Sequence, residues 1–358
     1  MSGYDYGNAR LHAMKSRLLS RSEIEELVAL DNLQVLIAAL TKTAYRKSIG
    51  VALAHTSGMS CIAEALRNDL INTLGKIRKF YQGQAGEMVT VMLRRYDIKN
   101  LKAILRGMGK SVPAGEILAS LLPIGELEYG TLTELARAPG PRAFIDLLAS
   151  MGLPFAQPLL LLRSERPEVS THEMELVLDQ WYFQEAFQTC QHVRGGGSVL
   201  LFSLQLEADL TNLLTVLRFA HAPAERKVLN DWFDTGDLES LFVGPGKLSF
   251  SLLADAGSQD TIESAIKILT ETPYKAALNA GLQAYAQSAR LSDFEKQLNR
   301  FRLNWMSRQF VNDPLGIGVF LGYLYLKVNE VSNIRWIAQA IQLEIKTNTI
   351  RSEMVFVS

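Results

Sequence analysis

The 358-residue sequence is poor in cysteine and histidine, the side chains that most often bind metals. Its two cysteines, Cys61 and Cys190, are far apart, and neither belongs to a CxxC pair or a cysteine–histidine cluster. A zinc site or a disulfide framework is therefore not expected. The five histidines are scattered, with no pair spaced four residues apart. The sequence predicts no bound metal and two reduced thiols.

Neither sign of charge is in excess, and long apolar runs are missing. Lys and Arg together number 37, and Asp and Glu also number 37. This balance disfavours nucleic-acid binding, because proteins that contact the phosphate backbone are usually basic. Uncharged stretches such as 195–206 and 315–326 have twelve residues, whereas a helix needs about 20 to span a bilayer. With no apolar signal segment at the start, we expect a cytoplasmic protein without direct transmembrane insertion.

Hydrophobic residues recur at three- and four-residue spacing along most of the chain. This spacing is typical of amphipathic helices. Alternating patterns that would predict β-strands are short and few. The sequence therefore predicts an all-α protein. The clearest stripes cover residues 24–40, 62–80, 174–187, 262–269 and 294–305.

A short motif occurs three times at long and similar intervals. In each copy an acidic residue is followed three residues later by Asn and then directly by an aliphatic residue. Asp209 follows Asp97 by 112 residues, and Glu330 follows Asp209 by 121 residues. Intervals above 110 residues indicate related domains rather than a short-period solenoid. The three copies are Asp97, Asn100 and Leu101; Asp209, Asn212 and Leu213; and Glu330, Asn333 and Ile334.

An aromatic residue repeats in step with this motif. Tyr45, Phe155 and Tyr274 each follow a small residue or proline, and they precede the acidic residue of the motif by 52, 54 and 56 residues. Two landmarks held at nearly constant separation three times are difficult to attribute to chance. We therefore predict three helical repeat domains, of residues 1–112, 113–224 and 225–358.

The motif is more consistent with a structural role than with a ligand site. An acidic residue at the start of a helical turn accepts hydrogen bonds from free backbone N–H groups. The aliphatic residues that follow would form a buried stripe. A ligand site remains the alternative, but three copies favour shared architecture.

No catalytic or nucleotide-binding arrangement is evident. Gly109-Lys110-Ser111 resembles the end of a phosphate-binding loop, but the required earlier glycine is replaced by Ile104. Because this segment follows a helical stripe, it is more typical of a helix C-terminus. No grouping of Ser, His, Asp or Cys for nucleophilic catalysis is present. The sequence predicts a non-enzymatic protein without a cofactor.

Three stretches of the chain resemble the C subunit of archaeal and bacterial V/A-type ATPases, the counterpart of the d subunit of eukaryotic V-type ATPases. The first is the opening, from Tyr6 to Leu27. The second extends from Tyr96 to Gly107 and is echoed by Asp209 to Arg218. The third, from Asp313 to Arg335, is the most specific. The order and spacing of these motifs extend the resemblance over nearly the whole chain.

The resemblance implies a funnel-shaped, all-α protein with three similar domains around a pseudo-three-fold axis. It also implies a non-catalytic connector in the central stalk, or rotor, of a rotary ATPase. One face would receive the D and F subunits of the central shaft, and the other would rest on the proteolipid ring of the membrane sector. The protein would be peripheral to the membrane and would transmit torque for proton or sodium transport. We take Arg106, Arg218 and Arg335, at the polar ends of the repeats, as candidate partner-facing residues.

Two other functions remain open from the sequence. A generic helical-repeat scaffold in another assembly would also be soluble and helical, although such scaffolds usually repeat every 30 to 45 residues. An enzyme with a site distributed over loops would need a pocket with perturbed titratable groups. The sequence leaves open the coupling ion, the direction of operation, the ring stoichiometry and the residues that contact shaft and ring.

Overall fold

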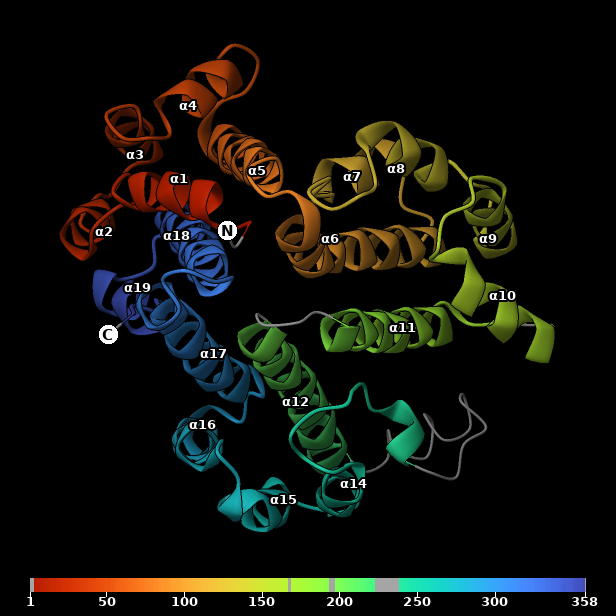
Figure 1. Ribbon diagram of the computed structural model, residues 1–358. Helices are drawn as coiled ribbons and strands as arrows, with labels where there is room; N and C mark the ends of the chain where they lie inside the picture. Colours follow the sequence, from red (N-terminus) through yellow and green to blue (C-terminus); the bar gives the residue numbers. More distant parts are fainter. Residues whose placement is uncertain (1–2, 167–168, 193–196, 223–237, 358) are drawn as a thin grey trace. The chain divides into compact units, whose positions relative to one another are not determined.

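The computed structural model describes residues 3–166, 169–192, 197–222 and 238–357. Helices make up most of these residues, and no β-strand occurs among them (Figure 1). The predicted all-α fold class is therefore confirmed. The chain forms two compact units, one of Met1–Val89 with Leu303–Ser358 and one of Thr90–Arg302.

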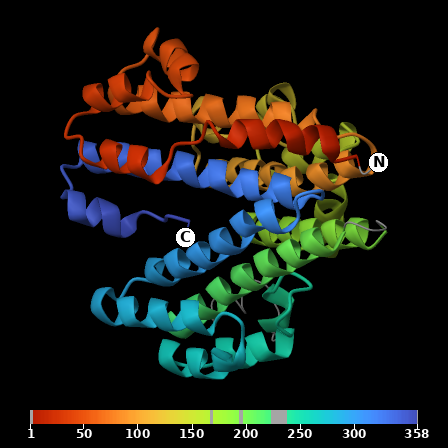
Figure 2. The same cartoon turned by 60° about the vertical axis from the view of Figure 1, so that its left-hand side comes forward.

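The first unit combines helices from the first and last parts of the chain. The long α18 packs against α1, α2, α3 and α5 (Figure 2). A helix surrounded in this way must be apolar on nearly all sides, and the side chains of α18 are largely buried. α18 is therefore the core of this unit. The helices are α1 (Asp5–Lys15), α2 (Arg21–Val28), α3 (Leu33–Leu40), α4 (Arg46–Leu53), α5 (Gly58–Arg78), α18 (Gly318–Gln342) and α19 (Thr347–Glu353).

The hydrophobic stripe predicted as one helix over residues 24–40 is two helices, α2 and α3. The break falls at Asn32, whose side-chain oxygen accepts a hydrogen bond from the backbone N–H of Gln34 at 2.6 Å and so begins α3. α2 begins in a similar way, because Ser20 and Glu23 form a reciprocal capping box. Local capping by polar side chains thus overrides a continuous apolar spacing.

The second unit contains two of the long helices at its centre. α11 and α12 pack against each other, and the shorter α14 and α15 pack against α12. Two other long helices, α6 (Gly83–Gly109) and α17 (Ser292–Asn312), contribute residues to both units. The remaining helices are α7 (Ala114–Ser120), α8 (Tyr129–Ala136), α9 (Pro141–Ser150), α10 (Ala156–Glu165), α11 (Thr171–His192), α12 (Gly197–His221), α14 (Phe250–Gly257), α15 (Ile262–Ile268) and α16 (Lys275–Ser288).

α12 is apolar enough to resemble a membrane span by composition. Among the described residues, only its segment Ser198–His221 has the length and hydropathy to cross a bilayer. However, 61% of its most apolar window is buried within the fold. A core helix of a folded protein has the same character.

The other predicted helical stripes are confirmed. Residues 62–80, 174–187, 262–269 and 294–305 fall almost entirely within α5, α11, α15 and α17, respectively. Gly109 is the last residue of α6, so Gly109-Lys110-Ser111 lies at a helix C-terminus as predicted, rather than between a strand and a helix.

Candidate functional site: three buried carboxylates and their backbone partners

The three copies of the repeated motif lie in the middle of long helices. Asp97 is on α6, Asp209 on α12 and Glu330 on α18. The prediction that these residues begin a helical turn is therefore wrong. All three are nonetheless buried, with exposed fractions of 0%, 0% and 4%. A buried carboxylate needs partners, and the structure supplies backbone N–H groups from other segments.

Asp97 and Asn100 hold a loop that follows α7. The Asp97 carboxylate accepts hydrogen bonds from the backbone N–H groups of Glu126 at 2.7 Å and Leu127 at 3.0 Å. The Asn100 side chain donates to the carbonyl of Leu122 and accepts from its N–H, both at 2.8 Å. One asparagine and one carboxylate on the same helix face therefore fix this short loop at both ends.

Asp209 and Asn212 hold a second loop in the same manner. Asp209 accepts from the N–H groups of Lys247 and Leu248, each at 3.1 Å. Asn212 exchanges two hydrogen bonds with Val243, at 2.8 and 2.9 Å. The loop residues contacted in the two copies, 122 with 126 and 127, and 243 with 247 and 248, have the same spacing. The motif is thus a repeated loop clamp, which we define as an acidic residue and an Asn that together hold a backbone segment.

Each of these two loops has glycine where it passes closest to the carboxylate. A Cβ atom at Gly125 would lie 2.1 Å from an oxygen of Asp97, and one at Gly246 would lie 1.9 Å from an oxygen of Asp209. Neither distance is sterically possible. The glycines are therefore required by the close approach of the loop to the clamp.

The third loop clamp, on α18, holds two separate segments. The Glu330 carboxylate accepts from the backbone N–H of Leu19, whereas Asn333 donates to the carbonyl of Val355 at 3.1 Å. A pocket of about 250 Å³ remains where the two segments meet, with Leu19, Asn333 and Phe356 in its lining. Segments from the two ends of the chain thus replace the single loop of the other copies.

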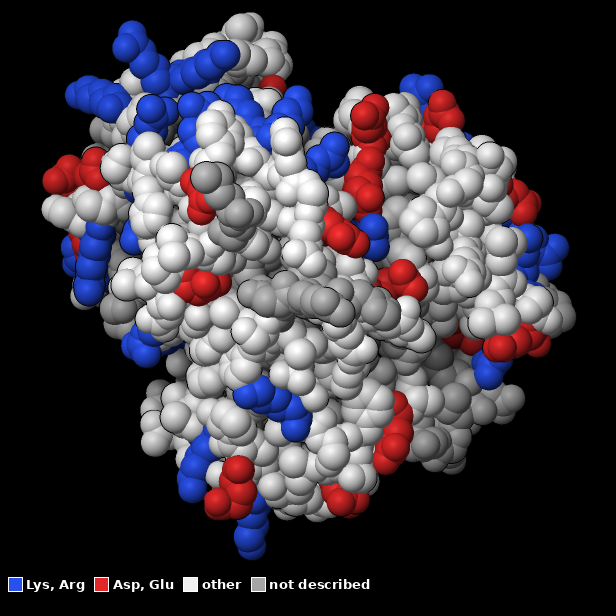
Figure 3. All heavy atoms as spheres, in the orientation of Figure 1, with Lys and Arg blue, Asp and Glu red and all other residues white. Residues whose placement is uncertain are grey.

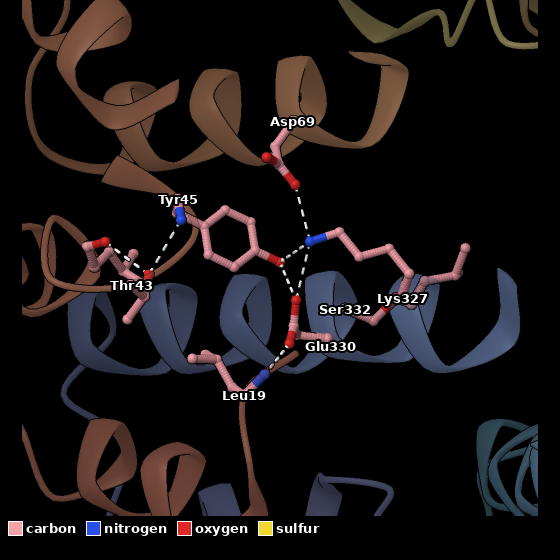
Figure 4. A network of polar contacts seen from close by, with 9 residues as sticks. Leu19, Thr43, Tyr45, Asp69, Lys327, Glu330 and Ser332 are labelled. Carbon is pink, nitrogen blue, oxygen red and sulfur yellow. Dashed lines mark hydrogen bonds and ion pairs between the residues drawn. The ribbon is translucent and has the colours of Figure 1, made fainter. Parts of the chain in front are cut away.

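Glu330 also takes part in a buried polar network (Figure 4). It accepts from the Tyr45 hydroxyl at 2.6 Å and pairs with the Lys327 ammonium at 3.0 Å. Lys327 also lies 2.8 Å from a carboxylate oxygen of Asp69 on α5. Burial raises the pKa of Tyr45 well above its usual value, and the Glu330 charge adds to this shift. Tyr45 therefore stays protonated and continues to donate its hydrogen bond.

The repeated aromatic residue belongs to the same arrangement. Tyr45, Phe155 and Tyr274 immediately precede α4, α10 and α16, and all three are at most 2% exposed. The Tyr274 hydroxyl donates to Asp209 at 2.7 Å, as the Tyr45 hydroxyl does to Glu330. Asp209 therefore accepts a hydrogen bond from Tyr274, which follows it in the sequence. The constant spacing was instead measured from Phe155, which precedes Asp209.

Burial shifts the titration of the two aspartates. It raises the pKa of Asp97 to about 6, although the N–H groups of Glu126 and Leu127 oppose this shift. Burial likewise raises the pKa of Asp209, against the opposing effect of the Tyr274 hydroxyl. Both carboxylates are satisfied by groups of the protein itself. Their arrangement stabilises loops and presents no reacting atom to a substrate.

The aliphatic residues of the motif are all completely buried. Leu101, Leu213 and Ile334 each have an exposed fraction of 0%. Each directly follows the Asn of its clamp, and its burial anchors that face of the helix in the core.

The three candidate partner-facing arginines are exposed. The Arg106 side chain, 59% exposed, donates two parallel hydrogen bonds to Glu175 on α11, from Nε to Oε1 and from Nη2 to Oε2. Arg218 is near the end of α12, and Arg335 is in the second half of α18. Their role toward a partner stays a prediction.

The second unit also contains a buried charge cluster that was not predicted from the sequence. The Glu207 carboxylate lies 3.0 Å from Arg95 and 3.0 Å from Arg302. Burial alone would raise the pKa of Glu207, but the two arginines outweigh it and lower the pKa to about 2. Arg95 and Glu207 each precede the acidic residue of their motif by two positions. An alignment of the repeats would have shown that Arg95 and Glu207 occupy equivalent positions with opposite charges. Nothing in the repeat pattern indicates Arg302.

The surface of the first unit carries a basic region. Figure 3 shows Lys and Arg side chains gathered over α3, α4 and α5, with few acidic side chains among them. The exposed basic residues of these helices and their ends are Lys42, Arg46, Lys47, Lys76 and Lys79. The aliphatic side chains of Val35, Val51 and Leu53 are also 46–54% exposed in this region. Such a mixture of basic and aliphatic side chains is typical of a contact surface.

The fold and the clamps define an all-helical, internally repeated protein whose buried polar groups serve its architecture. In the described part of the chain, no group of three His, Cys, Asp or Glu side chains is placed to hold a metal ion. The ATP synthase (C/AC39) subunit family matches residues 7–353. The chain belongs to this family.

Individual relatives are similar over nearly their full length. The C subunit of the A-type ATP synthase of Methanosarcina acetivorans is 26% identical over 99% of this chain and 94% of its own length. That of Methanocaldococcus jannaschii is 23% identical, over 99% of this chain and 87% of its own length. The C subunit of the V-type ATP synthase of Deinococcus radiodurans is 23% identical, over 98% and 91% of the two chains. The resemblance found in the sequence is thereby confirmed.

Proposed function

We propose that this protein is a non-catalytic connector in the central stalk of a rotary V/A-type ATPase. It would seat the D and F subunits of the shaft on the proteolipid ring and transmit torque between them. The family match over residues 7–353 carries this proposal. The relatives named as C subunits of A-type or V-type ATP synthases support it, since they match this chain almost from end to end.

The loop clamps support a mechanical role. An element that transmits torque has to resist twisting, and long unsupported loops would yield first. In this chain Asp97 and Asp209 fix two connecting loops to long helices through buried, charge-assisted hydrogen bonds. These bonds stiffen the connections between helices where a helical protein is most compliant.

The finer features of the proposal follow the resemblance. They are a funnel with a pseudo-three-fold axis, domains of residues 1–112, 113–224 and 225–358, and a peripheral position on the cytoplasmic side of the membrane. Arg106, Arg218 and Arg335 are the proposed partner-facing residues. A generic helical-repeat scaffold is the alternative, and the family match disfavours it.

Co-purification tests the assembly. A tagged form of this chain, isolated from native membranes in mild detergent, should recover the proteolipid ring and the D and F subunits by mass spectrometry. A tagged Leu213→Asp variant, whose core is disrupted, serves as the control and should not recover them. Recovery of the wild-type chain without ring and shaft would contradict the proposal.

Reconstitution separates a connector from a scaffold. A complex assembled without this chain should still hydrolyse ATP in its catalytic sector but should no longer couple hydrolysis to ion transport into vesicles. Adding the purified chain should restore coupling. Coupled transport without the chain would show that it has no connecting role.

A further inference from the structure

The outer face of α4 combines basic and aliphatic side chains. Arg46, Lys47, Val51 and Leu53 are all exposed, whereas Ile49 on the inner face of the same helix is completely buried. The basic side chains stand at the start of the helix and the aliphatic ones at its end. Because α4 is short, both kinds of side chain are presented close together at the surface.

Acidic side chains do not neutralise this surface. Residues 32–79 contain seven Lys or Arg but only two acidic residues, Glu64 and Asp69. Both acids already have partners within the first unit, since Glu64 lies 2.8 Å from His55 and Asp69 lies 2.8 Å from the buried Lys327. Basic side chains therefore dominate the charge of this surface (Figure 3).

The cations of α4 and of the turn before it are not explained by the stability of the fold. Lys42, Arg46 and Lys47 are exposed, and none of them forms an ion pair with a described residue. Arg46 and Lys47 occupy the first turn of α4, which has no acidic residue. Positive charges are unfavourable at a helix N-terminus, because the helix dipole is positive there. A role outside the fold accounts for these positions better than a structural one.

The composition of this surface fits a lipid surface better than a protein. Protein interfaces are enriched in Arg and aromatic residues and depleted in Lys. Four of the five exposed cations of the basic region are lysines, and the only Phe, Tyr or Trp among residues 32–79 is the buried Tyr45. Lysines beside exposed aliphatic side chains match an anionic membrane, which attracts the charges while the aliphatic groups enter its headgroup layer.

We propose that the outer face of α4, together with Lys42, binds anionic phospholipids at the surface of a membrane. Lys42, Arg46 and Lys47 contact the phosphate groups, and Val51 and Leu53 enter the headgroup layer without spanning the bilayer. Charge complementarity carries the choice of this partner. The inference goes beyond the proposed function, because the chain contacts lipid directly and not only through the proteolipid ring.

Vesicle binding by the full-length chain tests the proposal. The chain should bind phosphatidylcholine vesicles that contain about 30% phosphatidylglycerol, but not vesicles of phosphatidylcholine alone, and binding should weaken as salt is added. A triple variant with Lys42→Gln, Arg46→Gln and Lys47→Gln should bind the anionic vesicles about a hundredfold more weakly, since each basic residue near the surface contributes about fivefold.

A matched variant controls for net charge. Lys110→Gln, Lys267→Gln and Lys275→Gln together remove three exposed lysines of the second unit, and vesicle binding should stay unchanged. The triple variant near α4 should unfold at a temperature no lower than the wild type, because the cations that it removes make no ion pair and oppose the dipole of α4. Its weaker binding would then reflect the lost surface charges and not misfolding.

A fluorescent label distinguishes lipid from an acidic protein. Cys61 and Cys190 are buried, so Leu53→Cys can be labelled selectively with an environment-sensitive dye. The emission of the dye should shift to the blue when anionic vesicles are added, because the labelled position enters the headgroup layer. The same dye at Leu161→Cys, an exposed position of α10 in the second unit, should show no shift.

The outcomes separate the lipid site from its alternatives. Equal binding to neutral and anionic vesicles, equal binding by the wild type and the triple variant near α4, or an unshifted label at Leu53→Cys would each overturn the proposal. Binding of a polyglutamate peptide that requires the three cations, without binding of anionic vesicles, would show a protein-docking surface instead. Failure of lipid binding would leave the co-purification with ring and shaft unaffected, so the two proposals can fail separately.

Discussion

The loop clamps on α12 and α18 both hold backbone segments with a buried carboxylate and an Asn, but the segments are connected differently. On α12, Asp209 and Asn212 hold a single continuous loop, whose glycine allows the close approach. On α18, Glu330 and Asn333 hold segments from the two ends of the chain.

The chemistry of the α18 clamp compensates for the missing continuous loop. Glu has one more methylene than Asp and so reaches further. Its second oxygen is satisfied by the Tyr45 hydroxyl and the Lys327 ammonium instead of another loop N–H (Figure 4). Both clamps therefore keep a buried carboxylate with all its hydrogen-bond partners, whereas the chain segments that supply those partners differ.

The largest expected effect on stability comes from replacing the aliphatic residue beside each clamp, which tests whether the three clamps are equivalent. Leu101→Asp, Leu213→Asp and Ile334→Asp should each destabilise the protein by about 4 kcal/mol or more, because each buries a carboxylate without partners. Denaturant unfolding gives the total loss, and hydrogen exchange should show opening first in the second unit for Leu101 and Leu213 and in the first unit for Ile334. Leu343→Asp, at a site 68% exposed, should change stability little. Unchanged unfolding in all three buried variants would contradict their core role.

Substitution of the loop glycine tests only the two clamps that hold a single continuous loop. Gly125→Ala and Gly246→Ala should each cost about 3 kcal/mol, because the added Cβ would overlap the clamp carboxylate and displace the loop. The third clamp has no equivalent glycine contact among the described residues. Gly130→Ala, at a helical position where a Cβ meets nothing within 4 Å, is the matched control. It should be neutral or stabilising by up to about 1 kcal/mol. Equal stability of all three variants would mean that the loops are not held as described.

Acid titration tests the burial of Asp97. The folded-state pKa of about 6 lies above the unfolded value near 3.8, so the folded protein binds the proton more tightly. The contribution of this group is greatest below pH 4 and is lost as the pH rises to about 6, by up to about 3 kcal/mol. Asp97→Asn should remove this component of the pH dependence of the unfolding free energy. Parallel curves for wild type and variant between pH 4.5 and 7 would show that Asp97 titrates normally.

The smallest effects concern the aromatic hydroxyls. Tyr274→Phe and Tyr45→Phe should each cost about 2 kcal/mol, because each removes a hydrogen bond to a buried carboxylate. Phe155→Tyr makes the opposite change in the first copy. If the new hydroxyl reaches Asp97, it should lower the pKa of that carboxyl while stability changes by less than about 1 kcal/mol. NMR titration of Asp97 measures the shift, and an unchanged pKa would show that the Phe155 position differs from its counterparts.

Much of the fold is predictable from the sequence because helical periodicity and burial agree along the chain. The stripes that became α5, α11, α15 and α17 show this agreement. The break between α2 and α3 was not predicted, since a single capping contact at Asn32 decides it. Periodicity reports which face is buried, whereas capping reports where a helix begins.

The clamp residues could be found from the sequence, but their partners could not. Repetition identified Asp97, Asp209 and Glu330 as important, and a local rule then placed them wrongly at helix starts. Their hydrogen-bond donors lie about 30 residues away for Asp97 and 311 residues away for Glu330. Contacts at such separations depend on tertiary packing. The pairing of Arg302 with Glu207 also depends on tertiary packing, so it could not be predicted from the sequence.

The divided clamp on α18 has a consequence for biosynthesis. Residues 90–302 emerge from the ribosome as one continuous stretch, so the second unit has all its residues before α18 is made. The N-terminal helices α1, α2, α3 and α5 must wait for α18, which supplies the core against which they pack. During translation their apolar faces stay exposed and are candidates for chaperone protection. Synthesis of α18, rather than the appearance of the first helices, therefore sets the moment at which the first unit can fold.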